Sequence, residues 1–277
     1  MKRILLVILI LVCVMSMLSG CGNSAQVNTS SKTSEIIVFA AASMTETLTE
    51  LGDEFMADHE DVSIVFNFDS SGTLKTQIQE GADVDIFISA SQKQMDQLDI
   101  TSPAEINTEE LDFVLEGTRL NILENKVVLA VPDGNPANIQ SYEDMANGLA
   151  EGNIMLAMGN GDVPAGQYAE KILKYLDLNE EELSHNGVIT YGSNVKEITM
   201  QIIEGAVDCG IIYQTDAFSA GLTIVDTATE EMCGQVIYPA AVMKVSNNPE
   251  MAREFLEFLQ TTEAGVVFER VGFTPIK

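Results

Sequence analysis

Positive charge is scarce in this chain of 277 residues: 14 lysines and arginines stand against 42 aspartates and glutamates, a formal net charge of −28. A protein that binds nucleic acid needs a basic face to neutralise phosphates, and here the long-range interaction with a polyanion is repulsive. The composition therefore excludes nucleic acid as a partner. A small anion is not excluded, because exposed charges are screened beyond about 10 Å at ~0.1 M salt, whereas dipoles inside a closed cleft are not.

Histidine and cysteine are also scarce. The chain has two histidines, His59 and His185, and four cysteines, and no metal-ligand spacing is present. We therefore expect no metal centre and no cofactor. The chain also lacks a Gly-x-Ser-x-Gly elbow, and neither histidine lies in a motif that would place it beside a nucleophile. A serine hydrolase is thus a weak alternative, and we expect a protein that is not an enzyme.

The apolar run 4–12 follows Met1-Lys2-Arg3 and is too short for a stable membrane span. The leader ends in Leu18-Ser19-Gly20-Cys21, which resembles the end of a bacterial lipoprotein signal. We expect residues 1–20 to be a signal peptide, Cys21 to be lipidated and residues 21–34 to form a flexible tether. The folded part would then be anchored to the cell membrane on its extracytoplasmic face. An ordinary secretory signal or an anchor helix is the alternative.

Two further cysteines, Cys209 and Cys233, remain in the folded part. They could form a disulfide in an oxidising compartment, but Cys209 lies in the apolar run 207–213, where a buried thiol is equally natural. The sequence leaves both possibilities open.

Strand-like and helix-like patterns alternate along the mature chain. Alternating or continuous apolar runs indicate strands, and apolar residues at intervals of three and four indicate amphipathic helices. The first series predicts a βαβαβ unit with a mostly parallel sheet, a less regular stretch follows over residues 93–125, and a second α/β series comes after it. The predicted strands are 36–40, 62–68, 84–89, 126–131, 154–158, 188–191, 209–213, 222–225 and 236–244, and the predicted helices start near residues 44, 74, 167, 195, 249 and 263.

About 240 mature residues exceed a usual single domain, so we expect an α/β protein with two cores. The segment after residue 240 is too short for a domain of its own and must dock on an earlier one. An inserted second lobe explains this most simply. The expected first lobe is 35–127 with 241–277, the second lobe is 128–240, and two hinge crossings leave a ligand cleft between them.

Four turns lie where a strand-like run gives way to a helix-like one: Phe39 to Ser43, Asp69 to Thr73, Val163 to Gly166 and Gly192 to Val195. Backbone N–H groups in the first turn of a helix have no internal partner and carry the positive end of the helix dipole. Several such ends around one cleft bind an anion without lysine or arginine. The sequence therefore predicts an anion receptor.

The chain from about residue 35 to 277 resembles the molybdate-binding proteins of bacterial ABC-type molybdate transporters. The resemblance rests on six segments in order: 37–43 (IVFAAAS), 70–74 (SSGTL), 84–90 (VDIFISA), 163–169 (VPAGQYA), 210–213 (GIIY) and 271–273 (VGF). It implies the type II periplasmic-binding-protein fold. It also implies molybdate or tungstate as ligand, an ABC permease in the membrane as partner, and a monomer.

The resemblance also implies which residues contact the oxyanion: Ser43 and Ser71 in the first lobe, and Ala165, Val195 and Tyr213 in the second. The serines would give hydroxyl and backbone donors, Ala165 and Val195 their N–H groups, and Tyr213 its phenol. Each has an ordinary structural alternative, such as a capping box of Ser43 with Glu46. Two departures from the family bear on the site, namely the turn 159–162 and Asp69, which would lie beside the anion unless it caps the next helix from outside the cleft.

Donors alone suit molybdate, a dianion with four acceptor oxygens and no proton to give. A hydrogen phosphate ion would leave its O–H unpaired at such a site, at a cost of roughly 1–3 kcal/mol or more. Sulfate has no such proton, so only the size of the cavity could exclude it. Another tetrahedral oxyanion such as sulfate is therefore the alternative ligand.

Overall fold

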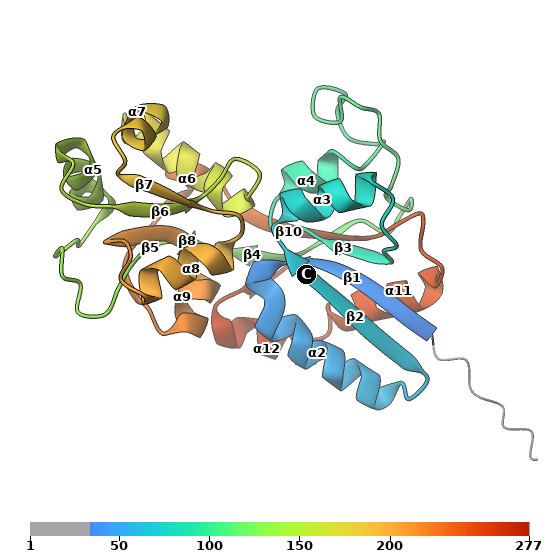
Figure 1. Ribbon diagram of the computed structural model, residues 1–277. Coiled ribbons are helices and arrows are strands. Elements are labelled where there is room, and N and C mark those ends of the chain that lie inside the picture. The colour runs from blue at the N-terminus through green and yellow to red at the C-terminus, as the bar shows by residue number, and fades with distance from the viewer. Residues whose placement is uncertain (1–33, 277) are drawn as a thin grey trace, which may run out of the picture. The chain divides into compact units, whose positions relative to one another are not determined.

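Two β-sheets, each with helices on both faces, make up residues 34–276, the part of the chain that the computed structural model describes (Figure 1). The predicted signal peptide, the predicted lipidation site Cys21 and the predicted tether up to residue 33 lie outside the described residues. Ser34, the last predicted tether residue, is already the first residue of a strand. No helix within residues 34–276 is long and apolar enough to cross a membrane.

The first sheet has six strands in the order β11-β4-β10-β3-β1-β2. Strand β1 pairs in parallel with β2 and β3, as the βαβαβ pattern predicts, and β10 pairs antiparallel with β3 and β4. Its strands are β1 (Ser34–Ala41), β2 (Val62–Asp69), β3 (Ile86–Ile88), β4 (Leu120–Asn125), β10 (Val236–Val242) and β11 (Thr274–Pro275). Its helices are the 3-10 turn η1 (Ala42–Met44), α2 (Thr45–Asp58), α3 (Ser71–Gln79), α4 (Gln92–Asp96), α11 (Pro249–Phe258) and α12 (Thr262–Val271).

The second sheet has five strands in the order β7-β6-β8-β5-β9. Strand β6 is parallel to β7 and β8, whereas β5 is antiparallel to β8 and β9. Its strands are β5 (Val127–Val131), β6 (Leu156–Gly159), β7 (Ile189–Gly192), β8 (Cys209–Tyr213) and β9 (Thr223–Thr227). Its helices are α5 (Tyr142–Glu151), α6 (Pro164–Tyr175), α7 (Glu180–His185), α8 (Val195–Ile203), α9 (Gln214–Ala220) and α10 (Glu230–Cys233).

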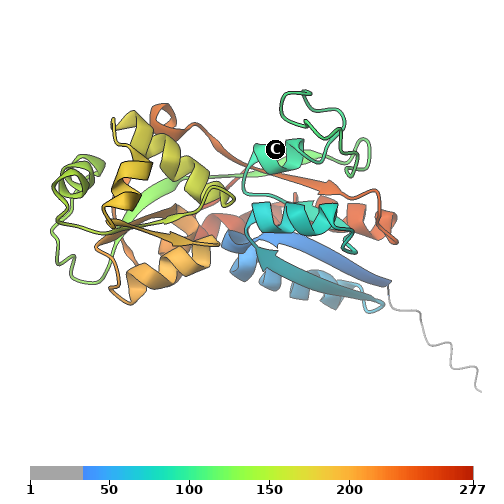
Figure 2. The ribbon, with the colours of Figure 1, turned by 45° about the horizontal axis from the view of Figure 1, so that its top comes forward.

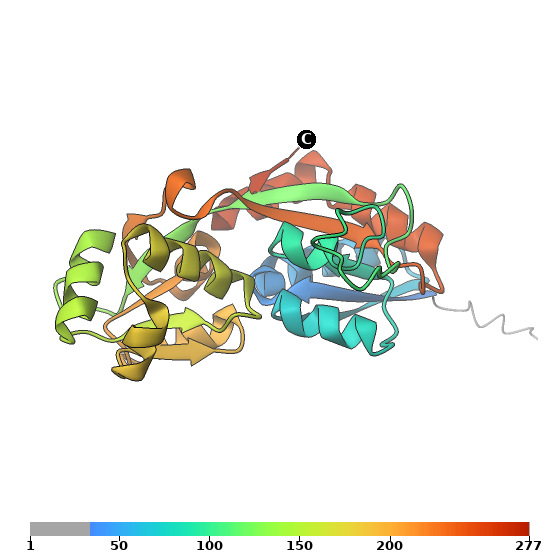
Figure 3. The ribbon, with the colours of Figure 1, turned by 90° about the horizontal axis from the view of Figure 1, so that it is seen from above.

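The chain passes between the sheets at two adjacent places. Only Lys126 separates β4 of the first sheet from β5 of the second, and the return passage lies between α10 and β10. Val236 at the start of β10 pairs with Asn125 at the end of β4, so the two passages lie side by side (Figures 2 and 3). The second sheet is thus an insertion between β4 and β10.

The chain passes from the first sheet to the second, and back again, earlier than the expected limits of 128 and 240. Val127 already belongs to the second sheet, and all of β10 belongs to the first. Strand pairing decides this limit, and a hydrophobic pattern does not record which sheet a strand joins.

The stretch expected to be irregular, 93–125, contains β4 and most of α4. Sequence patterning also missed β11 and the helices α5, α7, α9 and α10. Apart from α5, which has 10 residues, these elements have seven residues or fewer, so few apolar positions repeat within them.

The cores of the two lobes are continuous rather than separate, contrary to the expectation of two cores. One cluster of buried apolar side chains includes residues of both sheets, and a smaller one lies on the α3 and α4 side of the first sheet. Tyr213 of β8 and Tyr238 of β10 meet edge to face across the boundary, with ring centroids 6.0 Å apart. The two aromatic rings therefore join the lobes through a dry contact.

Cys209 and Cys233 are both free and buried, so the disulfide alternative is not realised. The Cys209 thiol lies 3.9 Å from the carbonyl oxygen of Met155, and the Cys233 thiol lies 3.8 Å from that of Thr229. Burial raises the pKa of both thiols, which keeps them protonated and unreactive.

Candidate functional site

Strand-to-helix turns of both lobes meet at one small pocket. It has about 200 Å³ of atom-free space, its opening to solvent included, and about 10 Å³ of this can hold the centre of a water molecule. A sugar, a peptide or a nucleotide would not fit. Its wall is formed by Ala41, Ala42, Ser43, Asp69, Ser70, Ser71, Ala90, Val163, Pro164, Ala165, Val195 and Tyr213. The structure thus brings together all five residues named from the sequence.

Ser71 presents a hydroxyl hydrogen with no acceptor among the described residues. It is the first residue of α3 and fully buried, and its Oγ accepts a hydrogen bond from the Ala90 N–H at 2.9 Å. Ser70 is the N-cap of this helix and accepts from the Thr73 N–H. Because the cap is the neighbouring residue, the Ser71 hydroxyl is left for another partner.

Ser43 lies in η1 and does not cap a helix. Helix α2 begins at Thr45 with Met44 as its N-cap and no side-chain cap, so the capping box with Glu46 is not formed. The Ser43 Oγ is instead 2.8 Å from the hydroxyl of Tyr238. Both serines are nearly or fully buried at the pocket wall.

The second lobe contributes two helix starts. Ala165 is the second residue of α6, whose N-cap Val163 offers no side-chain acceptor, and Val195 is the first residue of α8. The N-cap of α8, Asn194, accepts from the Glu197 N–H and leaves the Val195 N–H without a partner in residues 34–276. Both N–H groups therefore retain the unfilled donor capacity of a helix N-terminus.

The turn 159–162, which departs from the family pattern, is held by several hydrogen bonds, two of which are accepted by Asn160. The Val163 N–H donates to the Asn160 carbonyl at 2.9 Å, and the Asp162 N–H donates to Asn160 Oδ1 at 3.0 Å. Helix α6 still begins at Pro164. The altered turn therefore leaves Ala165 in the first helical turn.

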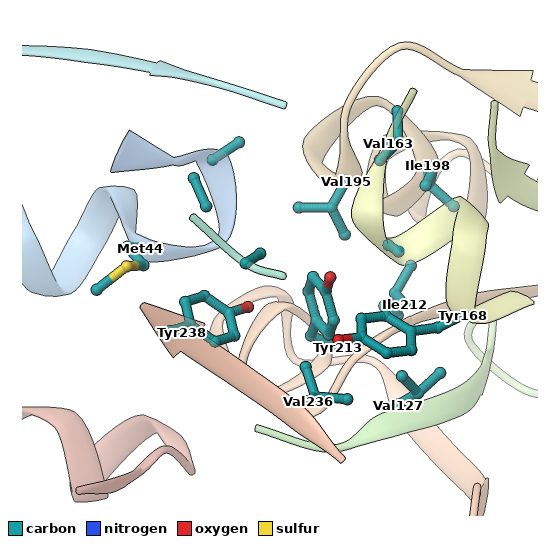
Figure 4. Packing of buried hydrophobic residues seen from close by; sticks show 14 of the residues in the cluster. Met44, Val127, Val163, Tyr168, Val195, Ile198, Ile212, Tyr213, Val236 and Tyr238 are labelled. Carbon is teal, nitrogen blue, oxygen red and sulfur yellow. The ribbon is translucent and has the colours of Figure 1, made fainter. Parts of the chain in front are cut away.

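Tyr213 carries an unsatisfied hydroxyl. Its side chain is 2% exposed, and its Oη has no hydrogen-bond partner in the described part of the chain. Figure 4 shows the ring between Tyr168 and Tyr238, with the hydroxyl directed toward the side on which Val195 lies. Burial raises the pKa of Tyr213 well above its ordinary value, so the phenol stays a donor. A buried donor without a partner costs about 1–3 kcal/mol, so a ligand that accepts from it is favoured.

The pocket wall contains no lysine or arginine, but it does contain one carboxylate, Asp69. Asp69 does not cap α3 from outside the cleft, because Ser70 is the cap. Its Oδ1 accepts from the Ser70 N–H at 2.7 Å and from Asn194 Nδ2 at 3.2 Å. Two donors thus partly compensate its charge, one of them from the opposite lobe.

The lobes touch around the pocket. Asn194 reaches Asp69 across the cleft, and next to it Lys196 of α8 bonds both carboxylate oxygens of Glu46 on α2 at 2.9 Å. Lys196 also lies 3.2 Å from Oδ1 of the buried Asp216, at ion-pair distance but without the geometry of a hydrogen bond. The described conformation is therefore a closed one. The N-cap pattern of the turn identifies Asn194 from the sequence, whereas no sequence signal identifies Lys196 or Tyr238.

The model of the family described as bacterial extracellular solute-binding proteins matches residues 36–274. The chain belongs to this family. Membership indicates an extracytoplasmic binding protein and supports a binding role rather than an enzymatic one. Residues 34–276 contain no group of three or more His, Cys, Asp or Glu side chains that could hold a metal ion.

Two curated relatives are similar over most of the chain. YvgL of Bacillus subtilis, provisionally named an ABC transporter substrate-binding lipoprotein, is 30% identical, with 93% of each chain covered. The molybdate-binding protein ModA of Haemophilus influenzae is 32% identical, with 87% of this chain and 90% of that one covered. The resemblance drawn from the six segments is thus confirmed.

Solved structures show the same fold. The periplasmic molybdate-binding protein of Azotobacter vinelandii aligns with a TM-score of 0.72 at 22% identity, covering 87% of this chain and all of that one. The sulfate-binding protein SubI of Mycobacterium tuberculosis aligns with a TM-score of 0.69 at 16% identity, covering 88% of each chain. The predicted two-lobed periplasmic-binding-protein fold is confirmed.

Replacing Gly72 by alanine should hinder closure of the lobes. A Cβ at Gly72 of α3 would lie 2.1 Å from the Asp162 carbonyl oxygen of the opposite lobe, a backbone atom that cannot move aside alone. Overpacking of this kind costs about 1–3 kcal/mol. We expect Gly72→Ala to bind molybdate roughly 5- to 150-fold more weakly in titration calorimetry, with the unliganded protein as heat-stable as before.

Gly161→Ala is the matched control, because a Cβ there meets only Glu170 Oε1 at 3.5 Å. Affinity in Gly72→Ala equal to that in Gly161→Ala would show that the lobes need not approach so closely.

Asp216 should make stability depend on pH. Burial raises its pKa from 3.8 to about 6, although Lys196 opposes the shift. Because the folded protein then binds the proton more tightly than the unfolded chain, ionisation of Asp216 lowers stability as pH rises from about 4 to about 6, and the penalty is constant above that. In urea denaturation, the free energy of unfolding of Asp216→Asn should therefore increase relative to that of the wild type as pH rises over this interval. A difference that decreases as pH rises would refute the assignment.

Proposed function

We propose that the protein captures molybdate, and tungstate with it, outside the cytoplasm and delivers it to an ABC permease. The observation that carries the proposal is the Tyr213 hydroxyl, a buried donor without a partner at a pocket that no lysine or arginine lines. The family membership and the similarity to ModA support the same assignment.

The chemistry of the pocket suits a fully deprotonated tetrahedral anion. Serine hydroxyls, first-turn N–H groups and the Tyr213 phenol supply donors from both lobes, so one ligand with several acceptor oxygens bridges them and favours the closed form. The proposed contacts are Ser43, Ser71, Ala165, Val195 and Tyr213. In the closed cleft these bonds are shielded from water and are stronger than exposed ones.

Hydrogen phosphate is one alternative ligand, because the Asp69 carboxylate at the wall could accept a hydrogen bond from the phosphate O–H. Both hydrogen bonds to this carboxylate are accepted by Oδ1, so a phosphate O–H would have to reach Oδ2 to find an acceptor. The relatives named for molybdate favour the unprotonated anion. Sulfate is the other alternative, since a sulfate-binding protein shares the fold.

Titration calorimetry with molybdate, tungstate, sulfate and phosphate tests the ligand. We expect molybdate and tungstate to bind with similar affinity. Phosphate should bind roughly 5- to 150-fold more weakly, because its O–H or a protein donor loses its partner. Sulfate should also bind more weakly, because its shorter bonds do not reach donors set for a larger anion. Tighter binding of sulfate or phosphate than of molybdate would overturn the proposal.

Serine variants, measured in the same titration, test whether the ligand lies at the first-lobe wall of the pocket. Ser43→Ala and Ser71→Ala should each weaken molybdate binding. Ser71→Ala should also lower the unliganded protein's unfolding temperature, because the Ala90 N–H loses its acceptor. Ser193→Ala is the control, since Ser193 is exposed and does not line the pocket.

We also propose that Cys21 carries a lipid that anchors the monomeric protein at the outer face of the cell membrane. The support is the Leu-Ser-Gly-Cys pattern and the similarity to YvgL. Cells fed a labelled fatty acid should incorporate it into the wild type, and Cys21→Ser should remain unlabelled. Label that persists in the variant would place the lipid elsewhere.

A further inference from the structure

We propose that Asn125 and Tyr238 form a hydrogen-bond relay that fixes the Ser43 hydroxyl as a donor to the ligand. The inference rests on the proposed function of the pocket, and it assigns a positioning role to two residues that do not line it.

The relay starts at an amide whose orientation is fixed. Asn125, the last residue of β4, is buried, and its Oδ1 accepts from the Lys126 N–H at 2.8 Å. The opposite end of the amide, Nδ2, faces Thr215 Oγ1 at 3.0 Å and the Tyr238 hydroxyl at 3.2 Å. Since the backbone N–H can only donate, the amide oxygen must face it, and Nδ2 must face the two hydroxyls.

The direction of the next bond follows from the single hydrogen of the phenol. Nδ2 can only donate, so the Tyr238 oxygen accepts from it. Tyr238 is fully buried, and its other partner in the described residues is Ser43 Oγ at 2.8 Å. If Ser43 donated to Tyr238, the phenol hydrogen would be buried without an acceptor. Tyr238 therefore donates to Ser43.

The Ser43 hydrogen is then left for the pocket. Its Oγ is occupied by the Tyr238 hydrogen, and Ser43 lines the pocket wall. The same polarity holds at Ser71, whose Oγ accepts from the Ala90 N–H. Both first-lobe hydroxyls are thereby set as donors before the ligand arrives, so the ligand meets them without reorganisation.

The relay begins at the passage between the sheets. Asn125 precedes Lys126, and Thr215, which shares the Nδ2 group, belongs to α9 of the second lobe. Figure 4 shows the Tyr238 hydroxyl pointing toward Tyr213, from the first sheet toward the second. The polarity of a pocket hydroxyl is thus set by a residue at the hinge.

A double-mutant cycle tests the relay. The wild type, Tyr238→Phe, Ser43→Ala and the double variant are titrated with molybdate by calorimetry. Tyr238→Phe should weaken binding about 5- to 10-fold in the wild type, because Ser43 no longer has a fixed direction, and less than about twofold when Ser43 is alanine. A purely structural role of Tyr238 would cause the same loss in both backgrounds.

Tyr142→Phe is the matched control, because the Tyr142 hydroxyl is buried, has no hydrogen-bond partner among residues 34–276 and does not line the pocket. Near-ultraviolet circular dichroism checks that each variant is folded. Asn125→Ala reaches the relay from its other end and should cause a loss that likewise vanishes in the Ser43→Ala background.

The relay is overturned if the wild type binds molybdate and Tyr238→Phe binds equally well, or if the two substitutions act additively. If the wild type itself gives no binding heat with molybdate, the proposed function is wrong. The two failures are therefore distinguishable in one set of titrations.

Discussion

The site depends on the cost of leaving a buried hydrogen-bond donor unfilled. The Tyr213 phenol, the hydroxyl of Ser71 and the first-turn N–H groups of Ala165 and Val195 have no acceptor in residues 34–276. A folded protein normally pairs such groups. Here they are gathered at one pocket, so a guest with several acceptor oxygens, such as the proposed ligand, would fill them. Because the unfilled donors belong to opposite lobes, a guest that accepts hydrogen bonds from both lobes would stabilise the closed form.

The absence of basic residues at the wall is a consequence of this arrangement. A lysine or arginine would give stronger attraction for any anion, but it would also hold protonated and unprotonated anions alike. Neutral donors with fixed directions instead select an anion by the number and position of its acceptor oxygens. Lys196, a cation near the pocket, instead forms an ion pair between the lobes with Glu46.

The sequence predicts the turns of the site well, because each turn has a local signature. Ser71 at a helix start, Pro164 before Ala165 and the Asn194-Val195 cap are all readable from neighbouring residues, and the structure places them in one wall. What it does not predict depends on pairing between distant segments. Strand β4 joins the first sheet only through β10 and β11, over 100 residues later, and no pattern within 120–125 records this. Tyr238, 195 residues from Ser43, reads as an ordinary core tyrosine. The position of Asp69 beside the site is readable from the sequence, but its hydrogen bond to Asn194 depends on how the lobes meet.

The passage between the sheets limits how the two lobes can part. Lys126 is the only residue between β4 and β5, and the return passage enters β10 beside it, where Val236 pairs with Asn125. Two short passages that lie this close together leave the lobes little freedom to slide or to separate by translation. Separation of the lobes would therefore be mainly a rotation about these passages, with the pocket mouth travelling the longest arc. A membrane partner of the kind proposed would then need to supply only torque to release the ligand.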